Sequence, residues 1–322
     1  MPEHKVLYLT QEEVAAAGVT MAEVIEALEI AFREHAEGRV EMPPKAVVHS
    51  RPGAFICAMP AYVPALHAVG MKWAGGYPEN AKRGLPRVTG LLVLNDEETG
   101  MPLAIMDGVW ITAKRTGAAT ALSAKHLARP DSQVVGILGC GVQGRSNLEA
   151  LNILFPLTQV MAYDPSPQQL DAFTAEAAAQ GLEVVKAGEP REAVDGCDLV
   201  VTAGVSRPRH RTIKPGWLNE GAFASLLDLD AYWEDAALQE VDKFTTDDLP
   251  QMEHYQAMGH FQGIPAIHAT LGEIAAGKKP GRQTEKERTI AANIGAAMAD
   301  MATAVLVHRR AVERGLGRWL PL

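Results

Sequence analysis

The amino-acid sequence predicts an α/β fold, in which a doubly wound parallel sheet is joined to a second, α+β domain. Three observations predict this fold. Residues 132–203 alternate between strand-like and helix-like segments, residues 46–94 consist of short apolar runs broken by Pro and Gly, and long helical patterns lie near both ends of the chain. The chain has 322 residues, which is enough for two domains.

The N-terminal third predicts a helix followed by an antiparallel sheet. Thr20 and Glu23 have the spacing of a capping box, and apolar residues recur at helical intervals from Val24 until Gly38. Short apolar runs follow, and the polar turn at residues 95–100 is typical of a β-hairpin with a longer loop. A second helical pattern then extends to Leu127.

A glycine-rich motif follows the first strand of the parallel domain. Residues 139–144 read Gly-Cys-Gly-Val-Gln-Gly and lie between a strand at 134–138 and a helical stretch at 145–154. Here the glycines permit a tight turn and a close approach of the backbone to a pyrophosphate, while the helix N-terminus offers free N–H groups. The motif therefore predicts a dinucleotide site whose cofactor contacts are Gly139, Gly141, Val142, Gln143 and Gly144.

The second strand of the parallel domain predicts which dinucleotide is preferred. It ends at Asp164, whose carboxylate is suited to accept hydrogen bonds from the adenosine ribose. Residues 165–167 contain no Arg that would bind a 2′-phosphate. NAD(H) is therefore favoured over NADP(H), unless a more distant cation such as Arg207 or Arg209 completes the site.

The C-terminal part predicts one long helix. Thr284 and Glu287 repeat the capping-box spacing, and apolar residues from Ile290 to Val305 recur at helical intervals. This Ala-rich segment is expected to pack against another element over most of its length.

Composition excludes several classes of protein. The net charge of -9, without a long block of one sign, predicts no nucleic-acid or membrane partner. No apolar run reaches the roughly 18 residues of a transmembrane helix, and the first residues lack the apolar region of a secretory signal, so a cytoplasmic location is expected. The three Cys are far apart and the ten His show no ligand spacing, which predicts neither disulfides nor a metal site.

Three of the cations before the nucleotide-binding motif lie beside apolar segments: Lys45, Lys72 and Arg115. Lys72 lies in an otherwise apolar strand-like run, where a buried charge without an anion would be costly. Arg115 lies in the helical stretch before the motif, and an Arg can hold a carboxylate through two parallel hydrogen bonds. Taken singly, each residue is more typical of a surface cation, so their role stays open at this point.

The chain resembles the ornithine cyclodeaminase/mu-crystallin family over almost its whole length. The resemblance is carried by residues 71–80, 84–86, 113–118, 139–144 and 271–277 and by the helix around Gly295 and Asp300. It implies a Rossmann-type, NAD-binding domain over residues 129–302 and a substrate-binding and dimerisation domain built from residues 1–128 and 303–322. A homodimer is therefore expected.

Position by position, the resemblance implies roles for the cations. Lys45 and Arg115 would hold the substrate carboxylate, and Lys72 would lie beside the reacting amine or imine. The family also places a catalytic Asp after a strand of the nucleotide-binding domain. Asp228 is the best match, and Asp230 is the competing assignment, because the Gly-rich basic segment usual after that Asp is replaced in this chain.

Cys57 departs from the pattern of ornithine cyclodeaminases. The resemblance implies a Glu at this position, two residues before Met59, that contacts the side-chain amine of ornithine. Without it a cationic tail loses its charge-assisted partner. The sequence therefore predicts an NAD(P)H-dependent oxidoreductase acting on small imino or amino acids, either a ketimine or imine reductase or an amino-acid dehydrogenase, with Lys72 and Asp228 as catalytic residues.

Two alternative functions stay open. An ornithine cyclodeaminase would release ammonia and recycle NAD, which makes it a lyase without net redox change. A protein of mu-crystallin type would bind the nicotinamide cofactor without catalysis. Both alternatives keep the same fold and the same dinucleotide site.

Overall fold

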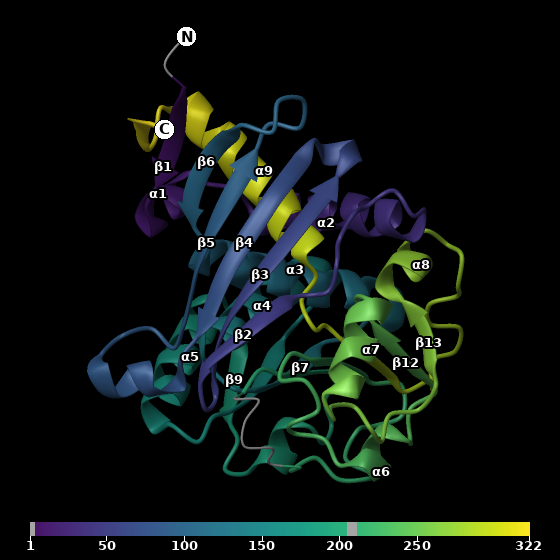
Figure 1. Cartoon of the computed structure of the whole chain (residues 1–322). Coiled ribbons are helices and arrows are strands. Elements are labelled where there is room, and N and C mark those ends of the chain that lie inside the picture. Colours follow the sequence, from purple (N-terminus) through teal and green to yellow (C-terminus); the bar gives the residue numbers. More distant parts are fainter. Residues whose placement is uncertain (1–3, 205–210) are drawn as a thin grey trace. The chain divides into compact units, whose positions relative to one another are not determined.

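The computed structural model of the chain describes residues 4–204 and 211–322 (Figure 1). The described chain divides into two compact units, one made of the residues up to Arg115 together with Ala296–Leu322, and the other of Thr116–Gly295. The domain bounds expected from the sequence, residues 1–128 with 303–322 and residues 129–302, stay a prediction.

The first unit is a seven-stranded sheet with helices along one face. Its strand order is β15-β1-β6-β5-β4-β3-β2, and neighbouring strands run antiparallel except that β1 is parallel to β6. Helix α9 packs along β3 and β4, and α2 packs against α9 (Figure 1). The elements are β1 (Lys5–Leu9), α1 (Gln11–Ala16), α2 (Met21–Ala36), β2 (Ala46–Arg51), β3 (Ala54–Val63), β4 (Ala68–Gly76), β5 (Val88–Asn95), β6 (Pro102–Asp107), α9 (Ala297–Arg314) and β15 (Arg318–Pro321).

The predicted helix at the N-terminus is confirmed. Thr20 and Glu23 form a capping box: the Thr20 side chain accepts from the backbone N–H of Glu23 at 3.3 Å, and the Glu23 carboxylate accepts from the backbone N–H of Thr20 at 2.7 Å. The helix ends at Ala36, shortly before Gly38, which has a φ of 72°. A left-handed glycine here satisfies the pattern of a helix C-terminus.

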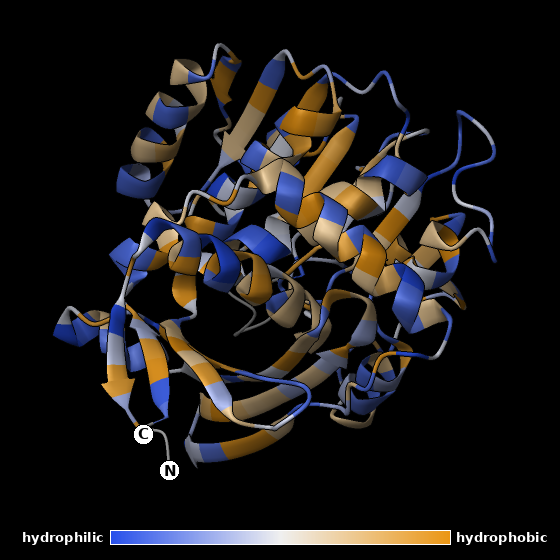
Figure 2. Ribbon diagram, turned by 90° about the horizontal axis from the view of Figure 1, so that it is seen from above, coloured by the Kyte–Doolittle hydropathy of each residue, from blue (hydrophilic) through white to orange (hydrophobic). Residues whose placement is uncertain are grey.

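The inner strands of this sheet alternate between a buried and a more exposed face, whereas β2 and β15 are exposed throughout. Hydrophobic and hydrophilic bands alternate along them, near the two termini in Figure 2. On β4 the buried face includes Gly70 and Lys72, whereas Trp73 points to the other face. Trp73 is 47% exposed and Leu91, its cross-strand neighbour on β5, is 45% exposed. One face of the sheet therefore carries exposed, large apolar side chains.

The second unit is an eight-stranded parallel sheet with the order β13-β12-β14-β11-β10-β7-β8-β9. The order reverses between β7 and β10, which is the switch point where ligands bind in doubly wound sheets. The predicted fold class is confirmed. Helix α3 (Val109–Leu127) begins in the first unit, and the remaining elements are β7 (Val134–Leu138), α4 (Val142–Leu154), β8 (Gln159–Tyr163), α5 (Pro167–Ala179), β9 (Glu183–Lys186), β10 (Leu199–Thr202), β11 (Phe223–Leu226), α6 (Asp235–Leu238), β12 (Lys243–Thr246), α7 (Leu249–Ala257), β13 (Ile267–Thr270), α8 (Leu271–Ala275) and β14 (Thr289–Ala292).

The prediction of one long C-terminal helix is wrong at its start. Residues Thr289–Ala292 form strand β14, which pairs with β11 on one side and β12 on the other, and the helix begins only at Ala297. All four residues of β14 are buried. A short, fully buried apolar run fits either a strand or a helix, so its periodicity is not decisive.

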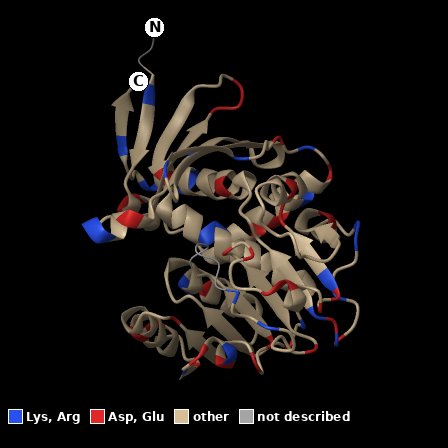
Figure 3. Cartoon of the chain, turned by 60° about the horizontal axis from the view of Figure 1, so that its bottom comes forward, with Lys and Arg blue, Asp and Glu red and all other residues tan. Residues whose placement is uncertain are grey.

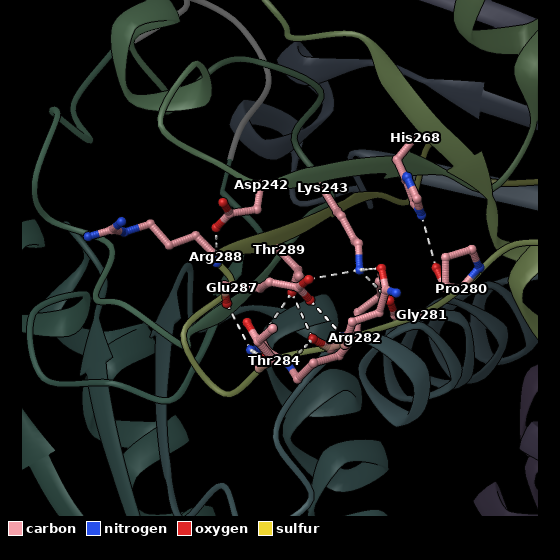
Figure 4. Close-up of polar contacts among 12 residues, drawn as sticks. Asp242, Lys243, His268, Pro280, Gly281, Arg282, Thr284, Glu287, Arg288 and Thr289 are labelled. Carbon is pink, nitrogen blue, oxygen red and sulfur yellow. Dashed lines mark hydrogen bonds and ion pairs between the residues drawn. The ribbon is translucent and has the colours of Figure 1, made fainter.

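A cluster of polar contacts fixes the segment that leads into β14 (Figure 4). Arg282 donates from Nε to the carbonyl of Leu127 at 2.7 Å and from Nη1 to the carbonyl of Glu287 at 2.8 Å. Lys243 on β12 donates to the carbonyl of Gly281 at 2.6 Å and to the Glu287 carboxylate at 3.0 Å. These contacts satisfy backbone oxygens of an irregular segment, which would otherwise be costly to bury.

Acidic and basic residues are interspersed over the described chain (Figure 3). Within residues 4–204 and 211–322, no helix has the length and hydrophobicity needed to cross a membrane. Among those same residues, no group of three or more His, Cys, Asp or Glu is arranged to hold a metal ion.

Candidate active site

The first unit contains a buried ion cluster centred on Asp300 of α9. Lys72 Nζ lies 2.8 Å from Oδ1 and 2.7 Å from Oδ2 of Asp300, and Arg115 donates from Nε to Oδ1 at 3.0 Å. Lys72 is 2% exposed, Arg115 is 8% exposed and Asp300 is 0% exposed. One carboxylate therefore holds two cations away from water.

The local sequence explains how these side chains meet. Lys72 belongs to the face of β4 that α9 covers, and Gly70 lies two residues earlier on the same face. A Cβ at Gly70 would lie 2.1 Å from the carbonyl oxygen of Val93 and 3.1 Å from the sulfur of Met301. The absence of a side chain at Gly70 therefore lets α9 approach the sheet closely enough for Asp300 to reach Lys72.

Burial and neighbouring charges set the protonation of the cluster. Burial, together with the positive charges of Arg115 and Lys45, lowers the pKa of Lys72 to about 8 against the opposing effect of Asp300. Burial alone would raise the pKa of Asp300, but Arg115 and Lys72 together hold it below its usual value. Lys72 therefore exchanges its proton near neutral pH, while Asp300 stays ionised.

The structure brings together all three predicted cations. Lys45 lies close enough for its charge to act on Lys72, Asp300 and Cys57. Cys57 is buried on β3, and burial raises the pKa of its thiol. In the fully protonated state the cluster carries more positive than negative charge, which favours binding of an anion.

The glycine motif of the second unit has the geometry that a dinucleotide needs. Gly139 has a φ of 102°, and a Cβ there would lie 2.6 Å from the carbonyl carbon of Ala203. A Cβ at Gly144 would lie 2.2 Å from the carbonyl oxygen of Gly139, whereas a Cβ at Gly141 would meet no atom within 4 Å. Gly141 is the N-cap of α4. The first and last glycines thus allow tight packing, and the middle one leaves open space at a helix N-terminus.

Asp164 is fixed beside this motif. Its Oδ2 accepts from the backbone N–H of Cys140 at 2.8 Å, and its Oδ1 accepts from the backbone N–H of Ser166 at 2.8 Å. Because β8 runs parallel to β7, the residue after β8 lies at the same edge of the sheet as the motif. The residues present therefore fit an adenosine dinucleotide, with the glycines at the pyrophosphate and Asp164 at the ribose.

Asp228 follows β11 and is almost completely buried, with 1% exposure. The Thr202 hydroxyl donates to its Oδ1 at 2.6 Å, and its Oδ2 has no hydrogen-bond partner among the residues that the structure describes. Burial raises the pKa of Asp228 to about 7. This carboxyl group therefore exchanges its proton near neutral pH.

Asp230 has a different environment. Its Oδ2 accepts from the backbone N–H of Phe261 at 3.0 Å, its Oδ1 lies 3.1 Å from His260 Nδ1, and Arg211 donates to Oδ2 at 3.4 Å. Leu229, between the two Asp, adopts a φ of 61°, which is strained for a non-glycine residue. Asp230 thus joins residue 211 and residues 260–261 to its own segment, whereas Asp228 keeps one carboxylate oxygen without a hydrogen-bond partner among the described residues.

Sequence reasoning missed the position of Asp300 as the counter-ion of both cations. One signal was present, because an acid among the apolar residues of a packing helix is costly to bury unless it is paired. Arg207 and Arg209, the two cations considered for a 2′-phosphate, lie outside the described residues.

Comparisons with known proteins match the chain over nearly its full length. A profile of the ornithine cyclodeaminase/mu-crystallin family matches residues 4–315. Alanine dehydrogenase from Archaeoglobus fulgidus is 36% identical over 319 residues, which cover 97% of each chain. The structure of Delta(1)-pyrroline-2-carboxylate reductase from Thermococcus litoralis, in complex with NADH and L-proline, is 33% identical with a TM-score of 0.88, covering 97% of this chain and 99% of the other.

A further similar structure is that of an archaeal alanine dehydrogenase dimer with bound NAD. It is 33% identical, has a TM-score of 0.88, and the match covers 99% of this chain and 100% of the other. Similar proteins of known structure therefore include two that hold a nicotinamide dinucleotide.

Proposed function

The chain belongs to the ornithine cyclodeaminase/mu-crystallin family, and on that basis we propose that it is a nicotinamide-dependent oxidoreductase that interconverts small imino and amino acids. Its relatives include an amino-acid dehydrogenase and a reductase of a cyclic imino acid. Both names describe reactions at the carbon that bears the nitrogen and the carboxylate of a small substrate.

The observation that carries the proposal is the buried excess of positive charge around Asp300. Two cations share one carboxylate in a site from which water is largely excluded, and a third, Lys45, is close enough to influence them. A substrate carboxylate would supply the missing anion. Arg115 uses Nε for Asp300, and its two terminal nitrogens have the fork geometry that binds a carboxylate.

We assign the predicted substrate-binding and catalytic residues the following roles in the reaction. When bound, the nicotinamide cofactor donates or accepts the hydride. Arg115 and Lys45 hold the substrate carboxylate, and Lys72 holds a proton close to the reacting nitrogen. Asp228, with its unpaired Oδ2 and a pKa of about 7, exchanges a proton with the substrate nitrogen as the bond order of the imine changes.

A pair of assays tests this function. One supplies cyclic ketimine carboxylates, or a 2-oxo acid with an amine, together with NADH. The other supplies ornithine with catalytic NAD. We expect NADH to be consumed in proportion to the amino acid formed in the first assay, and no proline in the second, because Cys57 offers no carboxylate for a second amine. Formation of proline and ammonia without net NADH change would overturn the proposal in favour of cyclodeamination.

NADH is expected to bind more tightly than NADPH. The Asp164 carboxylate, fixed by two backbone N–H groups, repels a 2′-phosphate that carries up to two negative charges. Fluorescence titration of both nucleotides measures the two dissociation constants, and we expect at least a tenfold difference. Equal dissociation constants would mean that a cation compensates Asp164.

We expect a homodimer formed through the exposed apolar face of the first sheet. Trp73 and Leu91 lie side by side on that face, and burying them against a second copy would remove apolar surface from water. Light scattering at micromolar concentration should give twice the mass of the chain, and Trp73→Asp should give the monomer. Ile30→Asp, at another exposed apolar position on α2, is the matched control. A monomeric wild type would refute the expectation.

A further inference from the structure

One cation is linked to Asp164 through the backbone of Cys140, although residues 165–167 contain none. Arg145, in the first turn of α4, donates from Nη1 to the carbonyl of Cys140 at 2.8 Å. The backbone N–H of the same Cys140 donates to Asp164 at 2.8 Å. Arg145 and Asp164 are thus joined through a single peptide residue at the adenosine end of the glycine motif.

Arg145 is also held from the neighbouring helix. Its Nε lies 2.8 Å from Glu176 Oε2, and Nη1 lies 3.4 Å from Gln169 Oε1, both on α5. The side chains of Arg145 and Glu176 are 26% and 55% exposed, so the pair is partly open to solvent. An Arg at this place is the kind of group that accommodates the 2′-phosphate of NADP(H).

We propose that Glu176 is a specificity-determining residue for the cofactor. By pairing with Arg145, Glu176 keeps this arginine from binding a 2′-phosphate. Among the described residues, Arg145 is the cation that the backbone of Cys140 links to Asp164. The inference rests on the proposed function, since it assumes that the glycine motif binds a nicotinamide dinucleotide. NADH lacks the phosphate and needs no cation there. Two carboxylates therefore disfavour NADPH. Asp164 would face the ribose, and Glu176 neutralises the charge of Arg145.

The ion pair between Arg145 and Glu176 can be removed without disturbing the fold, and its removal should change the affinity for NADPH. A partly exposed ion pair contributes little to folding stability, so its removal leaves the fold intact. Its effect on a nearby phosphate is larger, because the phosphate carries up to two negative charges and an Arg released from Glu176 can bind it bidentately. Glu176→Gln removes the negative charge and keeps the side chain at almost the same size.

The experiment compares the dissociation constants of NADH and NADPH for four variants of the full chain. Glu176→Gln is expected to tighten NADPH binding about fivefold, while the dissociation constant of NADH changes less than twofold. Asp164→Ser should tighten NADPH binding on its own, and the double variant should tighten it by more than either single change. Glu183→Gln is the matched control, because it removes the same charge from the amino end of β9.

A further variant shows whether the effect passes through Arg145. Adding Arg145→Ala to Glu176→Gln should abolish the gain in NADPH affinity. The inference is overturned if Glu176→Gln leaves the NADPH dissociation constant unchanged, or if the gain persists without Arg145. If the wild type binds neither NADH nor NADPH, the proposed function itself fails, and that outcome is distinct from an unchanged ratio of the two constants.

Discussion

Replacement of Lys72 by Ala is expected to lower kcat/KM for imine reduction by about a thousandfold. Two losses combine in this variant. The cluster loses one of its cations, so the substrate carboxylate is held less firmly, and the reacting nitrogen loses a proton donor with a pKa of about 8. Both kcat and KM should therefore change. Steady-state kinetics at saturating NADH measures the effect.

Controls separate this loss of chemistry from a loss of structure. Lys72→Met keeps the apolar stem of the side chain and should be as inactive as Lys72→Ala, while NADH titration should give a nearly unchanged dissociation constant for both. Lys82→Ala, at an exposed lysine that pairs with Glu79, should leave kcat/KM within twofold. If Lys72→Met retains more than a tenth of the wild-type activity, Lys72 takes no part in the reaction.

The second large effect is expected from Asp228→Asn, which should lower turnover about a hundredfold. With a pKa of about 7, Asp228 is protonated below neutral pH and ionised above it. Imine reduction needs a proton donor, so the wild-type kcat/KM should fall as the pH rises through about 7. Oxidation of the amino acid needs the ionised form and should show the opposite trend. The Asn variant should lack this limb of the pH profile in both directions.

Asp230→Asn is the informative comparison. Because Asp230 is bound by His260, by the backbone of Phe261 and by Arg211, its replacement should lower thermal stability and keep the pH limb that belongs to Asp228. If instead Asp230→Asn removes the limb and Asp228→Asn keeps it, the catalytic carboxylate is Asp230. The fold and the class of reaction would survive that result.

The two acids illustrate what the sequence could not decide. They stand two residues apart in one apolar stretch, and nothing local distinguishes them. The groups that bind the Asp230 carboxylate come from residues 211, 260 and 261. The Thr202 hydroxyl that binds Asp228 comes from the neighbouring strand β10. Only the folded chain brings these partners together, so the choice between the acids depends on tertiary structure.

The pairing of Asp300 and the strand β14 could not be predicted for the same reason. The partner of Asp300, Lys72, is 228 residues away in the chain, and β14 is a strand only because β11 and β12 lie on either side of it. By contrast, the strand, turn and helix around the glycine motif could be predicted from the sequence, since the motif, the preceding strand and Asp164 are all within one local segment. Features set by local motifs could therefore be predicted from the sequence, whereas features set by pairs of residues far apart in the chain could not.

The discontinuity of the first unit has a consequence for biosynthesis. Its sheet is encoded almost entirely before residue 116, but α9 and β15 leave the ribosome only after the second unit. The apolar face of β3 and β4 that α9 covers thus stays uncovered while the second unit is translated. Lys72 and Arg115 lack their counter-ion until α9 has been translated. The second unit, encoded without interruption, is free to fold cotranslationally, whereas the first acquires its core only after it.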